Sequence, residues 1–221
     1  QTMFVSPGYY QDTTAGFRVD ASTVPVKSAM GPIRLSSNDD VQEPGKSMSR
    51  QPEAFGLDRL QTPIGTALLV TDADGVLRAL DWEDHEPRMR ELLRLQYGAV
   101  ALKDARSPAA TRAALTGYFK GDLDRLGKIE WRVAGTPFQR KVWTALPMIP
   151  AGTTMSYGAM AARIDMPNAI RAVGHANGSN PLSVVVPCHR LIGANGSLVK
   201  YGGGLERKRW LLEHEGVVLR N

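Results

Sequence analysis

The sequence predicts two successive domains: a small α/β domain, followed by an α+β domain built on a winged helix-turn-helix. Two apolar runs joined by a glycine-containing turn, and then two amphipathic helices, indicate the α/β domain. Three short helices with capping residues, and then an apolar run and a glycine-rich turn, indicate the winged helix-turn-helix. The chain has 221 residues, 43% of them hydrophobic, so it can bury a sizeable core without disulfides.

The first 53 residues differ in composition from the rest of the chain. Ser, Gly, Pro, Asp and Gln are frequent in residues 1–53, and no apolar period of 2 or 3.6 residues persists there. Such a segment buries too little apolar surface to order itself, so we expect a flexible leader.

The α/β domain is expected over residues 57–130. Residues 62–82 hold two strand-like runs, and the DADG turn at residues 72–75 supplies the glycine that a hairpin needs for positive φ. Helices are expected over residues 86–97 and 109–119. The first of these helices is expected to bury one stripe: Met89, Leu92, Leu93 and Leu95.

The second domain is expected over residues 135–221, beginning with a helix over residues 137–149. Thr136 can cap this helix. Pro137 suits the first helical position, because a backbone N–H at that position has no hydrogen-bond partner within the helix and proline has no N–H to leave unpaired. The residues expected to face inward are Phe138, Val142, Trp143 and Leu146.

Two shorter helices complete the predicted helix-turn-helix. Ser156 is the expected cap of a helix over residues 157–164, and Asn168 is the expected cap of a helix over residues 169–177. Tight turns separate the three helices, as in a helix-turn-helix.

The rest of the domain is expected to form the wing. Residues 182–186 form an apolar run that predicts a buried strand, and residues 192–200 are typical of a hairpin. A last helix is expected from Gly204 or Leu205 to Glu215.

The carboxyl-terminal part of the chain is basic. Residues 131–221 carry 11 Lys and Arg residues against 4 Asp and Glu residues, a balance of +7, whereas residues 1–130 carry 16 against 18. A basic domain is typical of binding to a polyanion, most commonly nucleic acid. Chance segregation of charge is the alternative.

The third predicted helix is rich in small residues. Ala172 and Gly174 belong to a series that would let the helix backbone approach DNA closely, which suits the narrow minor groove, with Arg171 as the one long cationic arm. A tight helix-helix packing seam is the other interpretation of the same pattern.

Several classes of protein are disfavoured. One cysteine allows no internal disulfide and no cysteine-rich zinc site, and the four histidines lack ligand spacing, so we expect no metal and no cofactor. No apolar run reaches the roughly 18 to 20 residues of a membrane span, and the first ten residues lack a secretory pattern. We therefore expect a cytoplasmic protein without a membrane partner.

The single cysteine, Cys188, follows the apolar run directly. A lone cysteine in that position is more often an inert core residue than a nucleophile. However, His189 is next to it and can polarise or deprotonate the thiol, and Glu215 is the best-placed carboxylate to orient the imidazole.

Six motifs occur in order within residues 62–216: GTPFQRKVW, SYGAMA, RAVG, NGSNP, PCHR and WLLEHEG. With this order and spacing, the chain resembles the O6-alkylguanine-DNA alkyltransferases (methylated-DNA-protein-cysteine methyltransferases), bacterial members in particular. The resemblance implies an amino-terminal ribonuclease-H-like domain joined to a winged-helix domain. It also implies DNA repair by irreversible transfer of one alkyl group per molecule from O6-alkylguanine, and from O4-alkylthymine, to Cys188.

The resemblance implies a role for each matching residue of the reaction centre. Cys188 matches the alkyl acceptor, His189 the histidine that relays the thiol proton through a water, and Glu215 the carboxylate that holds this histidine. Tyr157 matches the tyrosine that assists rotation of the base and gives a proton to guanine N3. Asn180 matches the asparagine that supports the turn of the active site.

The resemblance also implies how double-stranded DNA is held by a monomer. Arg171 matches the arginine that fills the gap left by the flipped nucleotide, and Ala172 and Gly174 lie on the same DNA-binding helix. The residues of the loop that closes over the alkylguanine are Tyr201, Gly202 and Gly203.

Gly202 departs from the pattern of many members, which carry Ser or Ala at that position. A glycine offers no hydroxyl to guanine O6, and the pocket is expected to admit larger alkyl groups. The cysteines that bind zinc in the amino-terminal domain of some members are also absent.

Three other functions are alternatives to this one. Alkyltransferase-like proteins that bind lesions without repairing them have another residue in place of the cysteine, whereas Cys188 is present. A methyl-sensing regulator would need a set of amino-terminal cysteines that this chain lacks. A cysteine hydrolase would have to turn over through an acyl intermediate.

Overall fold

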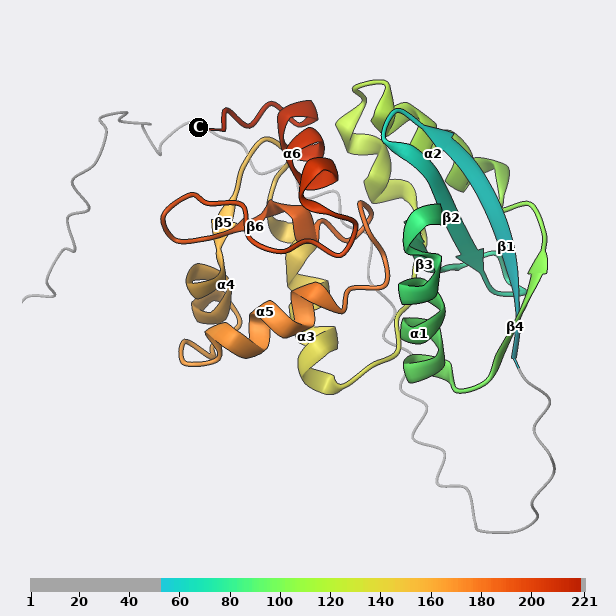
Figure 1. Ribbon diagram of the computed structural model, residues 1–221, viewed down its shortest axis with the longest axis horizontal. Helices are drawn as coiled ribbons and strands as arrows, with labels where there is room; N and C mark the ends of the chain where they lie inside the picture. The colour runs from blue at the N-terminus through green and yellow to red at the C-terminus, as the bar shows by residue number, and fades with distance from the viewer. Residues whose placement is uncertain (1–52, 220–221) are drawn as a thin grey trace, which may run out of the picture. The chain divides into compact units, whose positions relative to one another are not determined.

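The computed structural model describes residues 53–219, and its first part is a four-stranded sheet with the strand order β3-β2-β1-β4 (Figure 1). β1 pairs antiparallel with β2, β2 pairs antiparallel with β3, and β4 lies parallel to β1. The strands are β1 (Glu53–Thr62), β2 (Gly65–Thr71), β3 (Leu77–Trp82) and β4 (Val100–Asp104).

The two faces of the sheet are covered by different elements. Alternate strand residues, such as Leu68 and Val70, pack with Met89 and Leu93 of α1 (Glu86–Tyr97). Their neighbours in the strands join the larger core, which includes α2 (Ala109–Phe119). Both helices have the bounds expected from the sequence, but the stripe on α1 is narrower than expected, because Leu95 is 64% exposed.

The predicted hairpin at residues 72–75 is confirmed, with Gly75 at a φ of 79°. β1 and β4 were not predicted from the sequence, and the leader expected over residues 1–53 lies outside the described residues apart from Glu53, which begins β1. β1 was missed because Asp58 and Arg59 interrupt its apolar pattern. In the structure Asp58 accepts hydrogen bonds from Ser107 N at 2.9 Å and from Arg112 at 2.6 Å.

The second part is mostly helical. α3 begins after Thr136, whose hydroxyl accepts a hydrogen bond from Gln139 N while the Gln139 side chain accepts one from Thr136 N, so the predicted cap is confirmed. Ser156 caps α4 in the predicted way, by accepting from Ala159 N. The elements are α3 (Pro137–Ala145), β5 (Met155–Ser156), α4 (Tyr157–Arg163), α5 (Ile170–Gly178), β6 (Leu191–Ile192) and α6 (Leu205–His214).

One predicted helix length and one predicted cap were wrong. The helix expected over residues 137–149 ends at Ala145 and continues as a 3₁₀ turn over Leu146–Met148, since Pro147 has no N–H to extend the α-helical ladder. α5 begins at Ile170, and its cap position is taken by Ala169 without a side-chain hydrogen bond, so Asn168 is not the cap.

The strand expected over residues 182–186 is also wrong. These residues form consecutive turns, in which Val186 N donates to Leu182 O and Val185 N donates to Ser183 O. Val184 has a φ of 70°, a left-handed conformation that a β-branched residue rarely adopts and that no strand contains. A local hydrogen-bond network, described below, holds this turn.

The predicted hairpin wing is replaced by a parallel pair. β6 pairs with β5, and beyond it residues 193–197 close a turn through the bond from Gly193 N to Ser197 O, with no strand in residues 198–204. The last helix, α6, is confirmed.

The sheet meets the helical part directly. Leu80 N in β3 donates to Pro181 O, and Ser183 N donates back to Leu80 O. These bonds place the edge of the sheet beside the turn that precedes Cys188. Within residues 53–219, no helix combines the length and apolar character needed to cross a membrane.

Candidate active site

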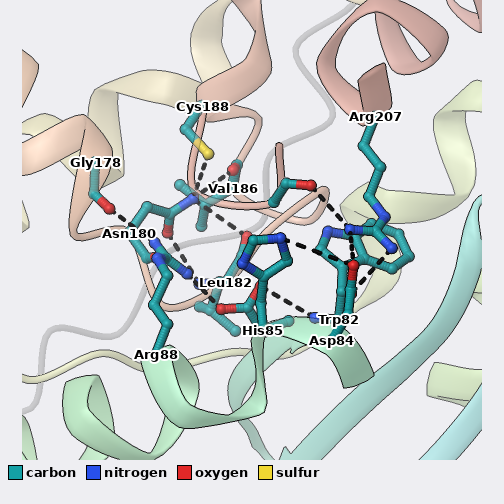
Figure 2. Close-up of polar contacts among 12 residues, drawn as sticks. Trp82, Asp84, His85, Arg88, Gly178, Asn180, Leu182, Val186, Cys188 and Arg207 are labelled. Atoms are coloured by element: carbon teal, nitrogen blue, oxygen red, sulfur yellow. Dashed lines mark hydrogen bonds and ion pairs between the residues drawn. The ribbon is translucent and has the colours of Figure 1, made fainter. Parts of the chain in front are cut away.

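Cys188 lies at the start of a 3₁₀ turn over Cys188–Arg190, directly after the turns at residues 181–187. Its residue is only 3% exposed, and its Sγ accepts a hydrogen bond from Asn180 Nδ2 at 3.0 Å (Figure 2). Burial raises the pKa of the Cys188 thiol, although this hydrogen bond acts in the opposite direction. The free protein therefore holds the sulfur as a neutral thiol at neutral pH.

Asn180 organises the turn as well as the sulfur. Its Nδ2 also donates to Val186 O at 2.8 Å, and its Oδ1 accepts from Leu182 N at 3.0 Å. Because the side chain is fully buried and fixed from both ends, the amide has a set direction toward Cys188. The structure thus brings together two of the residues expected from the sequence.

His189 and Glu215 form a second pair at the site. His189 Nε2 lies 2.9 Å from Glu215 Oε1, and both side chains are fully buried. Since an ionised carboxylate only accepts, Nε2 carries the ring proton and Nδ1 keeps its lone pair. Nδ1 is buried and has no hydrogen-bond partner among the described residues. Burial lowers the pKa of His189, so the imidazole is neutral.

Glu215 is held by two further residues that were not predicted. Arg190 donates from Nε to Oε2 and from a terminal nitrogen to Oε1, both at 2.8 Å, and the Tyr118 hydroxyl donates to Oε1 at 2.9 Å. Burial favours the neutral acid, but the bonds from His189 and Arg190 outweigh it and hold the pKa of Glu215 at about 2. Glu215 is therefore a permanent anion beneath His189.

Tyr157 is the first residue of α4 and is partly buried. Burial raises the pKa of its hydroxyl to about 12, which keeps it a proton donor. Asn177 Nδ2 lies 3.5 Å from this hydroxyl and donates to Cys188 O at 3.2 Å. Asn177, which was not predicted, thus links the tyrosine to the cysteine turn.

The small residues of α5 form the packing seam that was one of the two interpretations, and the close approach to DNA stays a prediction. Val173 and Ala176 are buried, and Ala176 O accepts a hydrogen bond from Trp143 Nε1 at 2.7 Å, which is a packing seam against α3. Arg171 and Ala172 are exposed on the other side. Gly174 is half-buried, and a methyl group there would only touch Tyr157. One face of the helix is therefore open for close approach.

Tyr201, Gly202 and Gly203 lie beside the cysteine turn. The Tyr201 ring is buried and lies edge-on to the His189 ring, with 6.5 Å between the ring centroids. A Cβ atom at Gly203 would collide with the Trp82 indole, and one at Gly202 would collide with the Arg88 guanidinium. The space of a side chain at position 202 is thus filled by Arg88, so the missing side chain does not widen the pocket as expected.

A buried lysine completes the surroundings of the sulfur. Lys208 of α6 is fully buried, and its Nζ donates to Leu191 O at 2.5 Å and to Val199 O at 3.1 Å. Burial lowers its pKa to about 8. Lys208 was not predicted, because a lysine in an amphipathic helix usually faces solvent. Among residues 53–219, no group of three or more His, Cys, Asp and Glu side chains is arranged to hold a metal ion.

Comparison with known proteins shows the family of the chain. Residues 137–217 match the family described as 6-O-methylguanine DNA methyltransferase, DNA binding domain. The methylated-DNA-protein-cysteine methyltransferase of Salmonella typhimurium is 46% identical over 164 residues, which cover 73% of this chain and 96% of that protein. The chain belongs to the methylated-DNA-protein-cysteine methyltransferase family.

Solved structures extend the methyltransferase match to both parts of the fold. Mycobacterium tuberculosis OGT, crystallised in complex with DNA, has a TM-score of 0.60 and 39% identity over 73% of this chain and 92% of that chain. The O6-methylguanine-DNA methyltransferase of Pyrococcus kodakaraensis shares the fold at 24% identity, with a TM-score of 0.60. The predicted order, a mixed α/β sheet domain followed by a helical DNA-binding domain, is confirmed.

The sequence could have revealed one of the unpredicted residues of the candidate site, but not the others. Arg190 follows His189 directly, so its place in PCHR was a usable signal. Tyr118 and Arg88 lie 97 and 92 residues from their partners Glu215 and Asn180, and no local pattern connects them.

Proposed function

We propose that this chain repairs DNA by moving the alkyl group of O6-alkylguanine in double-stranded DNA onto Cys188, one lesion per molecule. The observation that carries the proposal is the buried arrangement of one thiol, held by Asn180 at 3.0 Å, beside an imidazole held by Glu215 at 2.9 Å. Such a set can make a thiolate on demand, and the family membership supports this use of it.

The nucleophile forms when the thiol proton leaves Cys188. His189 accepts it at Nδ1, through one bridging water, and the Glu215 anion stabilises the resulting imidazolium. Since thiol and imidazole are both neutral at rest, the reactive ion pair exists only transiently. Arg190 and Tyr118 keep Glu215 charged and in place during this step.

The thiolate attacks the alkyl carbon in line with the bond to guanine O6. The S–C bond forms, the C–O6 bond breaks, and the electron pair stays on the guanine. Tyr157 donates its hydroxyl proton to guanine N3, and the imidazolium then returns a proton to the tyrosinate. In net balance, the thiol loses one proton, the guanine gains one, and His189 and Tyr157 return to their resting protonation states. The product is a thioether without a leaving group, which makes the protein a single-use reagent.

The target carbon is hidden inside the duplex, so the nucleotide must rotate out through the minor groove. This rotation costs a few kcal/mol. The open face of α5 at Ala172 and Gly174 lets the backbone approach the groove, and Arg171 fills the gap in the base stack, which offsets part of the cost. Tyr201, Gly202 and Gly203 close over the base. O4-alkylthymine carries the same type of alkyl carbon on oxygen and is a second substrate.

The test is a mass measurement after incubation with an oligonucleotide duplex carrying O6-methylguanine. We expect one added methyl group, on the peptide that contains Cys188, with a yield that stops at one per protein molecule. Cys188→Ser should lose the transfer and keep DNA binding. Repeated turnover would indicate a hydrolase, and lesion binding without an adduct would indicate an alkyltransferase-like protein. Action as a monomer in the cytoplasm remains a prediction from the sequence.

A further inference from the structure

Arg88 reaches the active-site turn from the other part of the fold. It lies on α1, and one of its terminal nitrogens donates to Gly178 O at 2.7 Å and to Asn180 O at 3.1 Å (Figure 2). Gly178 ends α5, where the carbonyl groups have no partner within the helix. The guanidinium therefore closes the end of α5 and fixes the backbone of Asn180.

Asp81 fixes the guanidinium in turn. Its carboxylate, on β3, is 1% exposed and pairs with the other terminal nitrogen of Arg88. It also accepts a hydrogen bond from Trp82 N at 3.0 Å. A buried carboxylate without its cation would be costly, so Asp81 and Arg88 act as a unit.

Gly202 belongs to the same arrangement. A Cβ atom at position 202 would overlap the Arg88 guanidinium. A flexible side chain usually gives way at little cost, but this one is fixed by Asp81, Gly178 and Asn180, so moving it would break those bonds. The residue types at positions 88 and 202 therefore depend on each other.

We propose that Arg88 is a positioning residue for the transfer reaction: it sets the Asn180 amide against Cys188 Sγ, and it requires glycine at position 202. The inference rests on the proposed function for its effect on transfer. Its structural content, the placement of Asn180 and the coupling to Gly202, can be measured without DNA.

The first measurement is the titration of Cys188, which the single cysteine makes simple. The absorbance of the thiolate is measured as a function of pH, and the absorbance of the Cys188→Ser variant is subtracted at each pH. The titratable and charged groups near this sulfur come from several elements: Arg88 and Asp81, Tyr157, His189, Tyr201 and Lys208. In Arg88→Ala the sulfur loses a nearby cation and a fixed hydrogen-bond donor, so the midpoint should rise by about one pH unit.

Arg112→Ala is the matched control. Arg112 pairs with Asp58 at 2.6 Å on the first part of the fold and is as exposed as Arg88, but it does not contact the site. Both variants should unfold at lower temperature, and only Arg88→Ala should shift the thiolate midpoint. Arg88→Lys keeps the charge without the fork of donors and should shift the midpoint less. Equal midpoints in Arg88→Ala and Arg112→Ala would reduce Arg88 to a purely structural residue and overturn the proposal.

The second measurement is the coupling between positions 88 and 202. Transfer from the free base O6-benzylguanine should slow about tenfold or more in Arg88→Ala and in Gly202→Ser. The double variant should be no slower than Arg88→Ala, since the collision is gone. If the rate reductions of the two single variants multiply in the double variant, the coupling is overturned. If the wild-type chain transfers nothing, the proposed function fails, and the thiolate titration together with thermal unfolding of the same variants still decides the role of Arg88.

Discussion

The side chains around Cys188 keep its thiol buried and neutral. Burial favours the neutral forms of Cys188 and His189. In the proposed reaction, therefore, no thiolate is present to react with other electrophiles before DNA binds. Glu215 is the exception, a fully paired anion in the same core. The cost of burying this charge is thus concentrated next to His189, where the imidazolium would form in the proposed reaction.

Glu215 should make the stability of the fold depend on pH in the acid range. Its pKa falls from 4.5 to about 2 on folding, so its contribution is complete above pH 4.5 and is lost as the pH falls through about 2. We expect about 3 kcal/mol between these limits. Glu215→Gln should lower the free energy of unfolding at pH 7. The difference in this free energy between the variant and the wild type, measured by chemical denaturation, should shrink as the pH approaches 2. Glu213→Gln, an exposed neighbour, should follow the wild-type pH dependence.

Tyr118 should matter for transfer, because its hydroxyl holds Glu215. Tyr118→Phe removes one hydrogen bond to a charged group, so the free energy of unfolding should fall by about 1.5–3 kcal/mol. Transfer from O6-benzylguanine should slow severalfold, because Glu215 is held less firmly. Tyr97→Phe removes a hydroxyl that accepts from Ala134 N at 3.2 Å and should leave transfer unchanged. Equal rates in the two variants would contradict a role for Tyr118.

Elements with local signals were predicted well from the sequence. α1, α2, α4 and α6 depend on apolar periodicity and on caps such as Ser156, which act within one helical turn. Residues 182–186 were misjudged because an apolar run is compatible with both a buried strand and a buried turn. The deciding interaction is the Asn180 side chain, which satisfies the backbone groups that a strand would otherwise pair.

Arg171 of α5 should affect repair only when the base lies in a duplex. Arg171→Ala removes the side chain proposed to replace the flipped nucleotide, so duplex repair should slow by about tenfold or more. Reaction with free O6-benzylguanine needs no flipping and should be unchanged. Arg90→Ala is the control for net charge, because it also removes one exposed arginine, on α1. Single-turnover rates on both substrates decide the point, and equal slowing on both would refute a flipping role.

At the scale of the whole molecule, the site depends on contacts between its two parts. The motifs near Cys188 predicted residues that the structure places around it, because His189, Asn180 and Glu215 are close in sequence or belong to one family pattern. They did not predict Arg88 and Tyr118, which reach Asn180 and Glu215 from α1 and α2, the helices that cover opposite faces of the sheet. Such residues are visible only once the sheet and the helices have packed on one core.

Repair itself should destabilise the protein, because the product must fit where only a thiol fitted. Cys188 is 3% exposed and its sulfur contacts the fixed Asn180 amide, so an added alkyl group overpacks this region or displaces the turn. Overpacking costs about 1–3 kcal/mol, which at this chain length corresponds to roughly 2–10 °C in the unfolding midpoint. The midpoint temperature of thermal unfolding should therefore fall after transfer from O6-methylguanine DNA, and it should fall further after transfer from O6-benzylguanine. Cys188→Ser treated in the same way is the control and should not shift; an unchanged or raised midpoint in the alkylated wild type would mean that the site has room for the product.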